Sequence, residues 1–260
     1  MINAHAIFRR VHEVTRAHIA RPPFPLAVQL SNDDVHIVQF SLNSYDDSTD
    51  LAPMLDDEER RRMARLVRES DRRRFLVSHA LTRLVLGRCL GDSPRLLRFG
   101  RGAHGKPRLV DASLDLRFNL SHAGERALLA VAIGRELGVD IEQERRLEVL
   151  GIARRYFSPS EYLALVSVPE ERRLGAFCRC WTRKESLLKA RGDGLAFPLD
   201  GFEVSLAETA PQLLVACANA PTELDRWTMA SVPVDPGYAG AVTGEGQGWR
   251  LTCWDNLVQE

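Results

Sequence analysis

The stretch GVDIEQERR, residues 138–146, places two carboxylates one residue apart in an otherwise apolar segment. If the segment is a strand, Asp140 and Glu142 point to the same face, with their Cα atoms about 6.6 Å apart. Acids this close repel each other unless a cation lies between them, and Mg²⁺ prefers carboxylate and phosphate oxygens as ligands. The alternative is a solvent-exposed face on which Arg145 and Arg146 balance the two acids. The rest of the sequence has to distinguish a metal site from a solvated face.

The composition is that of an ordinary globular protein. Of the 260 residues, 45% are hydrophobic and 27% are charged, so the chain can bury a sizeable core. Lys plus Arg equals Asp plus Glu at 35 each, so no net charge favours nucleic acid or an anionic membrane. No apolar run is long enough to span a bilayer. The five cysteines form no C-x-x-C pair, which argues against a zinc site or a disulfide framework. We therefore expect a cytoplasmic protein that binds neither nucleic acid nor membrane.

The N-terminal residues 1–31 differ from the rest of the chain. They begin with MINAHAIFRRVHEVTRAHIARPPFP, which is basic, weakly helical and ends in prolines. We expect an extension that lies outside the core. A transit peptide is an alternative, but Glu13 and the lack of serine in residues 1–25 argue against it.

Two segments of the first half carry basic or polar residues in a regular pattern. Apolar residues recur at close to a helical period over residues 56–90, which predicts two helices or one long bent helix. The first part is rich in arginine; such a run is usually a solvated face, and we expect only one or two of these residues to bind an anion. The turn RGAHGKPRL presents Lys106 before a proline. The alternating LRFNLSH predicts a strand that places Ser121 and His122 at its end, either as ligand-binding residues or as a simple turn.

The second half begins after the segment RALLAVAIG, whose propensity fits a helix or a strand equally well. FSPSEY predicts a helix start with a capping box between Ser158 and Glu161. A long helix is expected over residues 170–190, carrying WTRKESLLKARGDGL. In it Glu185 and Lys189 are four residues apart and share one helix face. Taken alone, such a pair is a surface ion contact. After this helix, apolar strands are expected at about 202–206, 226–232 and 238–242.

The motifs GKP, FNLSH, GVDIE, FSPSEY and WTRKESLLKARGDGL, in this order, closely resemble those of the 4′-phosphopantetheinyl transferases of the surfactin-synthetase-activating type. The resemblance extends from about residue 51 to VDPGYAGAV at 234–242. Enzymes of this family move the phosphopantetheine arm of coenzyme A onto a serine of a carrier protein and release 3′,5′-ADP. The resemblance implies an α+β fold of two pseudo-symmetric halves, each a small antiparallel sheet packed on a long helix. It also implies that RALLAVAIG is a strand.

The order long helix, strand, loop, strand occurs once before Gly134 and again after Gly138, which agrees with two related halves. We expect an N-terminal extension over residues 1–31 and an N-terminal half over 32–134. A C-terminal half should follow over 138–245, with a C-terminal strand or tail over 246–260.

The resemblance assigns Asp140, Glu142 and Glu185 as ligands of a divalent cation, Mg²⁺ or Mn²⁺. Lys189 matches the lysine that contacts the reacting phosphate, and Glu185 is the candidate that accepts the proton of the carrier serine. The resemblance therefore implies that a metal ion lies between the two acids of GVDIE.

The resemblance also assigns residues that bind coenzyme A. Those expected to contact its phosphates, above all the 3′-phosphate, are Lys106, Ser121, His122, Arg62 and Arg74. Lys184 also matches a family position and is predicted to bind coenzyme A as well, without a specific contact. Glu59 departs from the pattern, because relatives can carry a base at this position.

The partners implied by the resemblance are coenzyme A and an apo carrier protein or carrier domain, and we expect the enzyme to be a monomer. An acidic carrier helix is expected to dock beside the second half, near Arg172, Arg173 and Arg183, although plain solvated charges are an equal alternative there. Two other functions are considered. A non-catalytic coenzyme A or carrier-binding protein would not need the four charged site residues, and a Mg²⁺-dependent phosphohydrolase would need a residue that positions a water.

Overall fold

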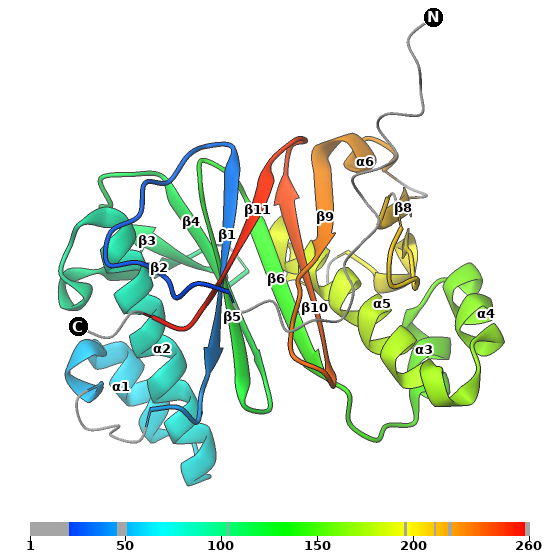
Figure 1. The fold of residues 1–260 in the computed structure, drawn as a ribbon, viewed down its shortest axis with the longest axis horizontal. Coiled ribbons are helices and arrows are strands. Elements are labelled where there is room, and N and C mark those ends of the chain that lie inside the picture. Colours follow the sequence, from blue (N-terminus) through cyan, green and yellow to red (C-terminus); the bar gives the residue numbers. More distant parts are fainter. Residues whose placement is uncertain are drawn as a thin grey trace, which may run out of the picture.

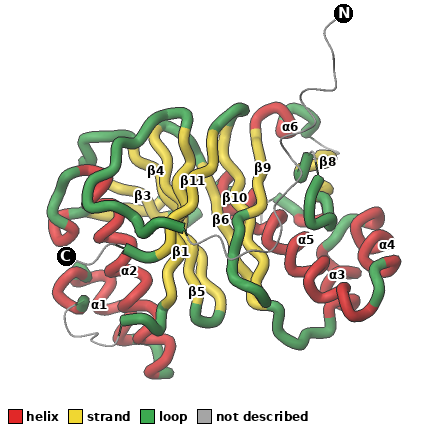
Figure 2. Tube along the Cα trace, viewed as in Figure 1, coloured by secondary structure: helices red, strands yellow, loops and turns green. Residues whose placement is uncertain are grey.

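The computed structural model describes residues 21–45, 51–102, 104–194, 197–210, 212–217 and 220–257. The chain folds into two halves that lie side by side, each with a β-sheet and a long helix (Figure 1). The strands of the two larger sheets occupy the centre of the molecule and the longer helices cover its two outer sides (Figure 2). This arrangement confirms the expected α+β class with two related halves.

The N-terminal half is built on a sheet with strand order β11-β1-β5-β4, in which β11 (Arg250–Asp255) comes from the end of the chain. Its elements, apart from β11, are β1 (Asp34–Ser41), α1 (Asp57–Ala64), α2 (Glu69–Leu90), β2 (Arg98–Arg101), β3 (Pro107–Val110), β4 (Leu116–Ala123) and β5 (Arg126–Ile133). The predicted helical region therefore consists of two helices. A capping box between Asp56 and Glu59 starts α1, and Gly91 ends α2 in the left-handed conformation. The segment RALLAVAIG is β5, as the resemblance implied.

The C-terminal half is built on an antiparallel sheet with strand order β6-β10-β9. Its elements are β6 (Leu137–Gln143), α3 (Val149–Tyr156), α4 (Pro159–Ser167), α5 (Glu170–Arg191), β7 (Phe202–Val204), β8 (Leu214–Cys217), α6 (Glu223–Arg226), β9 (Trp227–Ser231) and β10 (Tyr238–Glu245). The capping box predicted at Ser158 and Glu161 is present at the start of α4. Helix α3 was not predicted.

Three groups of buried apolar residues form the core of the molecule, one in each half and one between the halves. One lies between α2 and the first sheet, and the second surrounds α5. The third lies between the two sheets and joins Ile37 and Leu128 of the first sheet to Val139, Ile141 and Val242 of the second. Because the halves share this buried layer, the ends of β4 and β6 keep a fixed position relative to each other.

The chain end returns to the N-terminal half. Strand β11 (Arg250–Asp255) pairs with β1 in parallel, so the first sheet is mixed and not purely antiparallel as expected. The start of the described chain lies beside it: Phe24 is fully buried, bridges to Leu257 and packs edge-on against Trp254. The prediction that residues 1–31 lie outside the core is therefore wrong around Phe24, while residues 1–20 lie outside the described part. Within the described residues, no helix is long and apolar enough to cross a membrane.

Candidate active site

The site is formed where α5 packs directly against β6. Gly138 faces the helix, and a Cβ added there would lie 2.2 Å from the backbone N of Ala190 and 2.3 Å from the backbone O of Ser186. The absence of a side chain at residue 138 thus allows helix and strand to touch. Because alternate residues of a strand share a face, Asp140 and Glu142 point toward the same helix. This close packing brings them to the part of α5 that carries Glu185 and Lys189.

Asp140 is the most buried acid of the group, with only 4% of its surface exposed. Its Oδ1 accepts hydrogen bonds from Lys189 Nζ at 2.5 Å and from Ser121 Oγ at 2.8 Å. Lys189 also donates to Ser121 Oγ at 3.0 Å. Burial raises the pKa of Asp140, whereas the Lys189 ammonium and the Ser121 hydroxyl act to lower it. The structure therefore brings together three residues that the sequence placed in three separate motifs.

Glu142 and Glu185 complete a group of three interacting carboxylates. Burial, and then the neighbouring charge of Asp140, raise the pKa of Glu142 to about 6. The same two causes, in the same order, raise the pKa of Glu185. Negative charge is thus concentrated in a partly buried place, with Lys189 as the cation that lowers both values.

The three carboxylates fit a divalent cation that is also bound by substrate. Within the described residues, no three His, Cys, Asp or Glu side chains already form a metal-binding cluster. Mg²⁺, however, commonly uses only one or two carboxylates and completes its shell with substrate phosphate and water. The second oxygen of Asp140, Oδ2, is buried and has no hydrogen-bond partner among the described residues. An oxygen of this kind, beside two further carboxylates, fits an oxygen-coordinated cation.

Strand β4 forms the opposite wall and uses both of its faces. Asn119 and Ser121 face β6, where Asn119 Oδ1 accepts a hydrogen bond from the backbone N of Val139 at 2.9 Å. This bond fastens β4 of one half to β6 of the other. His122 points to the other face, and its pKa is lowered by partial burial and by the charges of Lys189 and Arg74.

Three cavities adjoin around the end of β4. The first, which we call the α2 cavity because His79 and Thr82 of α2 line it, has a volume of about 340 Å³. The second, lined by Arg74 and called the Arg74 cavity, has a volume of about 500 Å³. The third, lined by Lys189 and called the Lys189 cavity, has a volume of about 360 Å³. His122 lines the first two, and Asn119 lines the first and third. Other lining residues are Arg62, Arg101 and Phe99 in the α2 cavity, Glu142 and Arg145 in the Arg74 cavity, and Lys106 and Glu185 in the Lys189 cavity.

Three predicted cationic residues line these cavities but already have partners. Lys106 Nζ donates to Glu136 Oε2 at 2.7 Å and to the backbone O of Ala190 at 3.1 Å. Arg74 forms ion pairs with Asp71 at 3.2 Å and with Glu125 at 3.1 Å. Arg62 lies over the ring of Phe75, 5.2 Å from its centroid. All three are therefore placed beside the cavities by contacts within the protein.

Lys184 contradicts its predicted contact with coenzyme A. Its side chain is fully buried, and Nζ lies 2.7 Å from Glu161 Oε2. Nζ also donates to the backbone O of Leu199 at 2.7 Å and of Phe202 at 2.6 Å. On a helix, residue 184 points about 100° away from residue 185, so it faces the core when Glu185 faces the site.

Arg183 likewise does not fit the expected carrier-docking surface. It is 1% exposed, and its guanidinium donates to the backbone O of Ser205 and to Ser231 Oγ. Arg172 is exposed and Arg173 is partly exposed. The docking prediction is thus wrong for Arg183.

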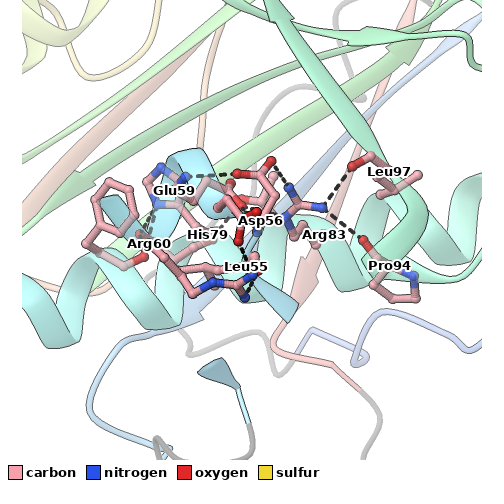
Figure 3. Close-up of polar contacts among 12 residues, drawn as sticks. Leu55, Asp56, Glu59, Arg60, His79, Arg83, Pro94 and Leu97 are labelled. Carbon is pink, nitrogen blue, oxygen red and sulfur yellow. Dashed lines mark hydrogen bonds and ion pairs between the residues drawn. The ribbon is translucent and has the colours of Figure 1, made fainter. Parts of the chain in front are cut away.

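Glu59, the departure from the family pattern, has a structural partner. Its Oε2 accepts from Nε of the fully buried Arg83 at 2.7 Å, and Asp56 Oδ2 accepts from Nη2 of the same arginine at 2.5 Å (Figure 3). Arg83 also donates to the backbone O of Pro94 and Leu97. The negative charge of Glu59 is thereby balanced within the N-terminal half.

Some residues of the site were missed in the sequence. Asn119 is two residues before Ser121 in a predicted strand, so alternation alone would have placed it on the same face. His79 is one helical turn after Phe75 and lines the α2 cavity. Its signal is a titratable residue inside the largely apolar run FLVSHALTRLVL, which equally fits a histidine satisfied within a core.

Comparisons with known proteins agree with this geometry. Residues 43–133 match the family described as 4′-phosphopantetheinyl transferase, N-terminal, and residues 136–243 match the 4′-phosphopantetheinyl transferase superfamily. The 4′-phosphopantetheinyl transferase HetI of Nostoc sp. is 36% identical over 236 residues, which cover 89% of this chain and 96% of the relative. The corresponding enzyme Sfp of Bacillus subtilis is 32% identical over 185 residues, covering 71% and 80%. The chain therefore belongs to the 4′-phosphopantetheinyl transferase family, and the resemblance carried by the five motifs is confirmed.

Proposed function

We propose that the protein transfers the 4′-phosphopantetheine arm of coenzyme A to a serine of an apo carrier protein, giving the holo-carrier and 3′,5′-ADP. The observation that carries this proposal is the group of Asp140, Glu142, Glu185 and Lys189 at the contact of β6 and α5, beside three adjoining cavities. Family membership supports the same reaction.

The charges around the cavities suggest how coenzyme A binds. The nucleotide end, with its 3′-phosphate, is placed in the α2 cavity, where Arg62 and His122 supply nitrogen donors and Phe99 supplies an aromatic wall. The pyrophosphate then extends toward Ser121 and Lys189. Lys106 reaches it by exchanging Glu136 for a phosphate oxygen, since both bind the ammonium as anions.

Asp140, Glu142 and Glu185 would hold a Mg²⁺ or Mn²⁺ ion. When bound, such an ion neutralises the negative charge that develops on the departing bisphosphate. The ion's ligands come from a strand and a helix that pack rigidly, which keeps the three oxygens in place.

The protein's own residues position the reactants and accept the proton. The carrier serine Oγ forms a new bond to the phosphorus next to the pantetheine, and the bond from this phosphorus to the oxygen of 3′,5′-ADP breaks. Glu185 accepts the proton from the serine hydroxyl, as a general base at the edge of the Lys189 cavity. Lys189 donates to the oxygens of the transferred phosphate, and Ser121 holds the lysine in position.

We also infer a reducing cytoplasm as the place of the reaction and a monomeric enzyme. All five cysteines are free and four of them are buried, which supports the first inference. Light scattering on the purified protein tests the second.

The test of the function is to incubate the protein with coenzyme A, Mg²⁺ and a panel of apo carriers, and to weigh the carriers by mass spectrometry. We expect one carrier or more to gain the mass of a phosphopantetheine group, with release of 3′,5′-ADP. Binding of coenzyme A without any mass gain would support the alternative, a non-catalytic coenzyme A or carrier-binding protein. Release of 3′,5′-ADP without a carrier would identify a phosphohydrolase.

A further inference from the structure

His79 of α2 is held by its own helix with one ring nitrogen free. Its ring stacks on that of Phe75, with centroids 3.7 Å apart and an angle of 15° between the planes. Nδ1 lies 3.0 Å from the backbone O of Phe75. Because a carbonyl oxygen can only accept, Nδ1 carries the hydrogen in this contact. Nε2 is then the free nitrogen, and among the described residues it has no hydrogen-bond partner.

The free nitrogen belongs to a side chain that lines a cavity with charged residues of both signs. Arg62 of α1, Arg101 of β2 and His122 of β4 line the same α2 cavity. Its three acidic lining residues are engaged by two arginines: Asp56 and Glu59 share Arg83, and Glu58 lies 3.8 Å from Arg101. Among the described residues Arg62 forms no ion pair, so an entering anion would meet one arginine without a carboxylate partner, beside the rings of His79 and His122.

This environment keeps the imidazole neutral when no anion is present. Burial, followed by the charges of Arg62, His122 and Arg83, lowers the pKa of His79 to about 4, although its hydrogen bond to Phe75 acts in the opposite direction. A bound dianion reverses the electrostatic part of this balance, because opposite charge stabilises the protonated ring.

We propose that His79 is a specificity-determining residue for the phosphomonoester of coenzyme A: Nε2 binds the 3′-phosphate in the α2 cavity, and the ring takes up a proton as the phosphate binds. This inference rests on the proposed function, since it requires coenzyme A to place its nucleotide end in this cavity. It adds a residue that the family motifs did not indicate.

The proposal has a defined dependence on pH. The free protein carries no proton on Nε2 between about pH 6 and pH 8, whereas the complex carries one at the acidic end of this range, so the contribution of His79 to affinity grows as the pH falls. If the ring in the complex titrates near pH 7, this contribution changes by about tenfold between pH 6 and pH 8. The 3′-phosphate itself titrates near pH 6 and acts in the opposite direction, so only a comparison with variants isolates His79.

Two substitutions separate the ring nitrogens. His79→Asn keeps a donor for the carbonyl of Phe75 but removes the group at the position of Nε2. His79→Gln keeps a neutral donor near the position of Nε2 but cannot take up a proton. Both variants should be checked for folding by circular dichroism, and if one fails to fold the other still tests the proposal.

The experiment is isothermal titration calorimetry with coenzyme A and with 3′-dephospho-coenzyme A, in EDTA, at about pH 6 and pH 8, in two buffers of different ionisation enthalpy. We expect His79→Asn to weaken coenzyme A binding roughly tenfold or more at pH 6, the effect of losing a hydrogen bond to a charged group, and to leave 3′-dephospho-coenzyme A binding unchanged. His79→Gln should recover part of the affinity at pH 8. The number of protons taken up when coenzyme A binds should be smaller in both variants than in wild type, by the amount that His79 takes up.

Four results would overturn the proposal. Equal weakening for both ligands would show that His79 only supports the structure. Unchanged proton uptake in the variants would show that His79 does not take up a proton when coenzyme A binds. If His79→Asn bound coenzyme A with unchanged affinity while the wild-type protein transferred phosphopantetheine normally, the inference would fail and the proposed function would stand. If the wild-type protein did not bind coenzyme A, both would be refuted.

Discussion

Replacing Gly138 with alanine should damage the site without removing any charged group. The new Cβ would lie 2.2 Å from the backbone N of Ala190, 2.3 Å from the backbone O of Ser186 and 2.7 Å from the backbone C of Lys189. All three are main-chain atoms, so no side chain can rotate out of the way. Either α5 or β6 has to move.

The size of the effect follows from these distances. Ordinary contacts between non-bonded heavy atoms are about 3.5 Å, so the helix has to retreat from the strand by roughly 1 Å. Overpacking of this kind costs about 1 to 3 kcal/mol of unfolding free energy. The same movement would draw Lys189 away from Asp140, and a displacement of about 1 Å at a catalytic group lowers the rate by about 100-fold.

We would measure transfer to an apo carrier by mass spectrometry and unfolding by urea. The expected result for Gly138→Ala is a lower kcat with a smaller change in KM for coenzyme A, together with a lower urea midpoint. Gly175→Ala is the matched control on the same helix, because the nearest atoms to its Cβ, at 3.2 and 3.3 Å, belong to the flexible side chains of Glu144 and Arg179. Wild-type activity and stability in Gly138→Ala would refute the close contact of α5 and β6.

Three further substitutions test other parts of the structure. Lys184→Met should cost about 3 to 5 kcal/mol of unfolding free energy, because it leaves Glu161 buried without its partner, yet the coenzyme A affinity of the folded protein, measured by calorimetry, should not change. Asn119→Ala should cost about 1 to 3 kcal/mol by leaving the backbone N of Val139 unpaired; an unchanged urea midpoint would contradict this. His79 has a pKa of about 4 in the folded protein, against an ordinary value of 6.5, so the unfolded chain takes up the proton first and folding stability is lost as the pH falls from 6.5 to 4. His79→Phe should remove about 3 kcal/mol of this loss. Equal pH dependence of the urea curves of wild type and His79→Phe would refute this assignment.

Local patterns predicted much of the fold. The capping box at Ser158 needs only neighbouring residues, and the strand ending in Ser121 follows from simple alternation, so both could be predicted from short stretches. The motif resemblance then supplied what local patterns left open, namely that residues 126–134 form a strand and that Asp140 and Lys189 belong to one site.

Contacts between distant segments were not predicted. The parallel pairing of β11 with β1 joins residues more than two hundred positions apart, and neither strand carries a signal for its partner. Lys184 was misassigned because its partner Glu161 lies on another helix. The pairing of Lys106 with Glu136 was also invisible, since it depends on how the two halves meet. In each case the deciding interaction is tertiary.

The central claim is that Asp140, Glu142 and Glu185 bind the divalent cation required for phosphopantetheine transfer. The most direct measurement is the rate of carrier modification as a function of Mg²⁺ concentration, for wild type and for Asp140→Asn, which preserves the size of the side chain and removes its charge. The account predicts that wild type requires Mg²⁺, and that Asp140→Asn folds and binds coenzyme A but transfers almost no phosphopantetheine even at saturating Mg²⁺. Transfer by Asp140→Asn at the wild-type rate with the same Mg²⁺ dependence would contradict it.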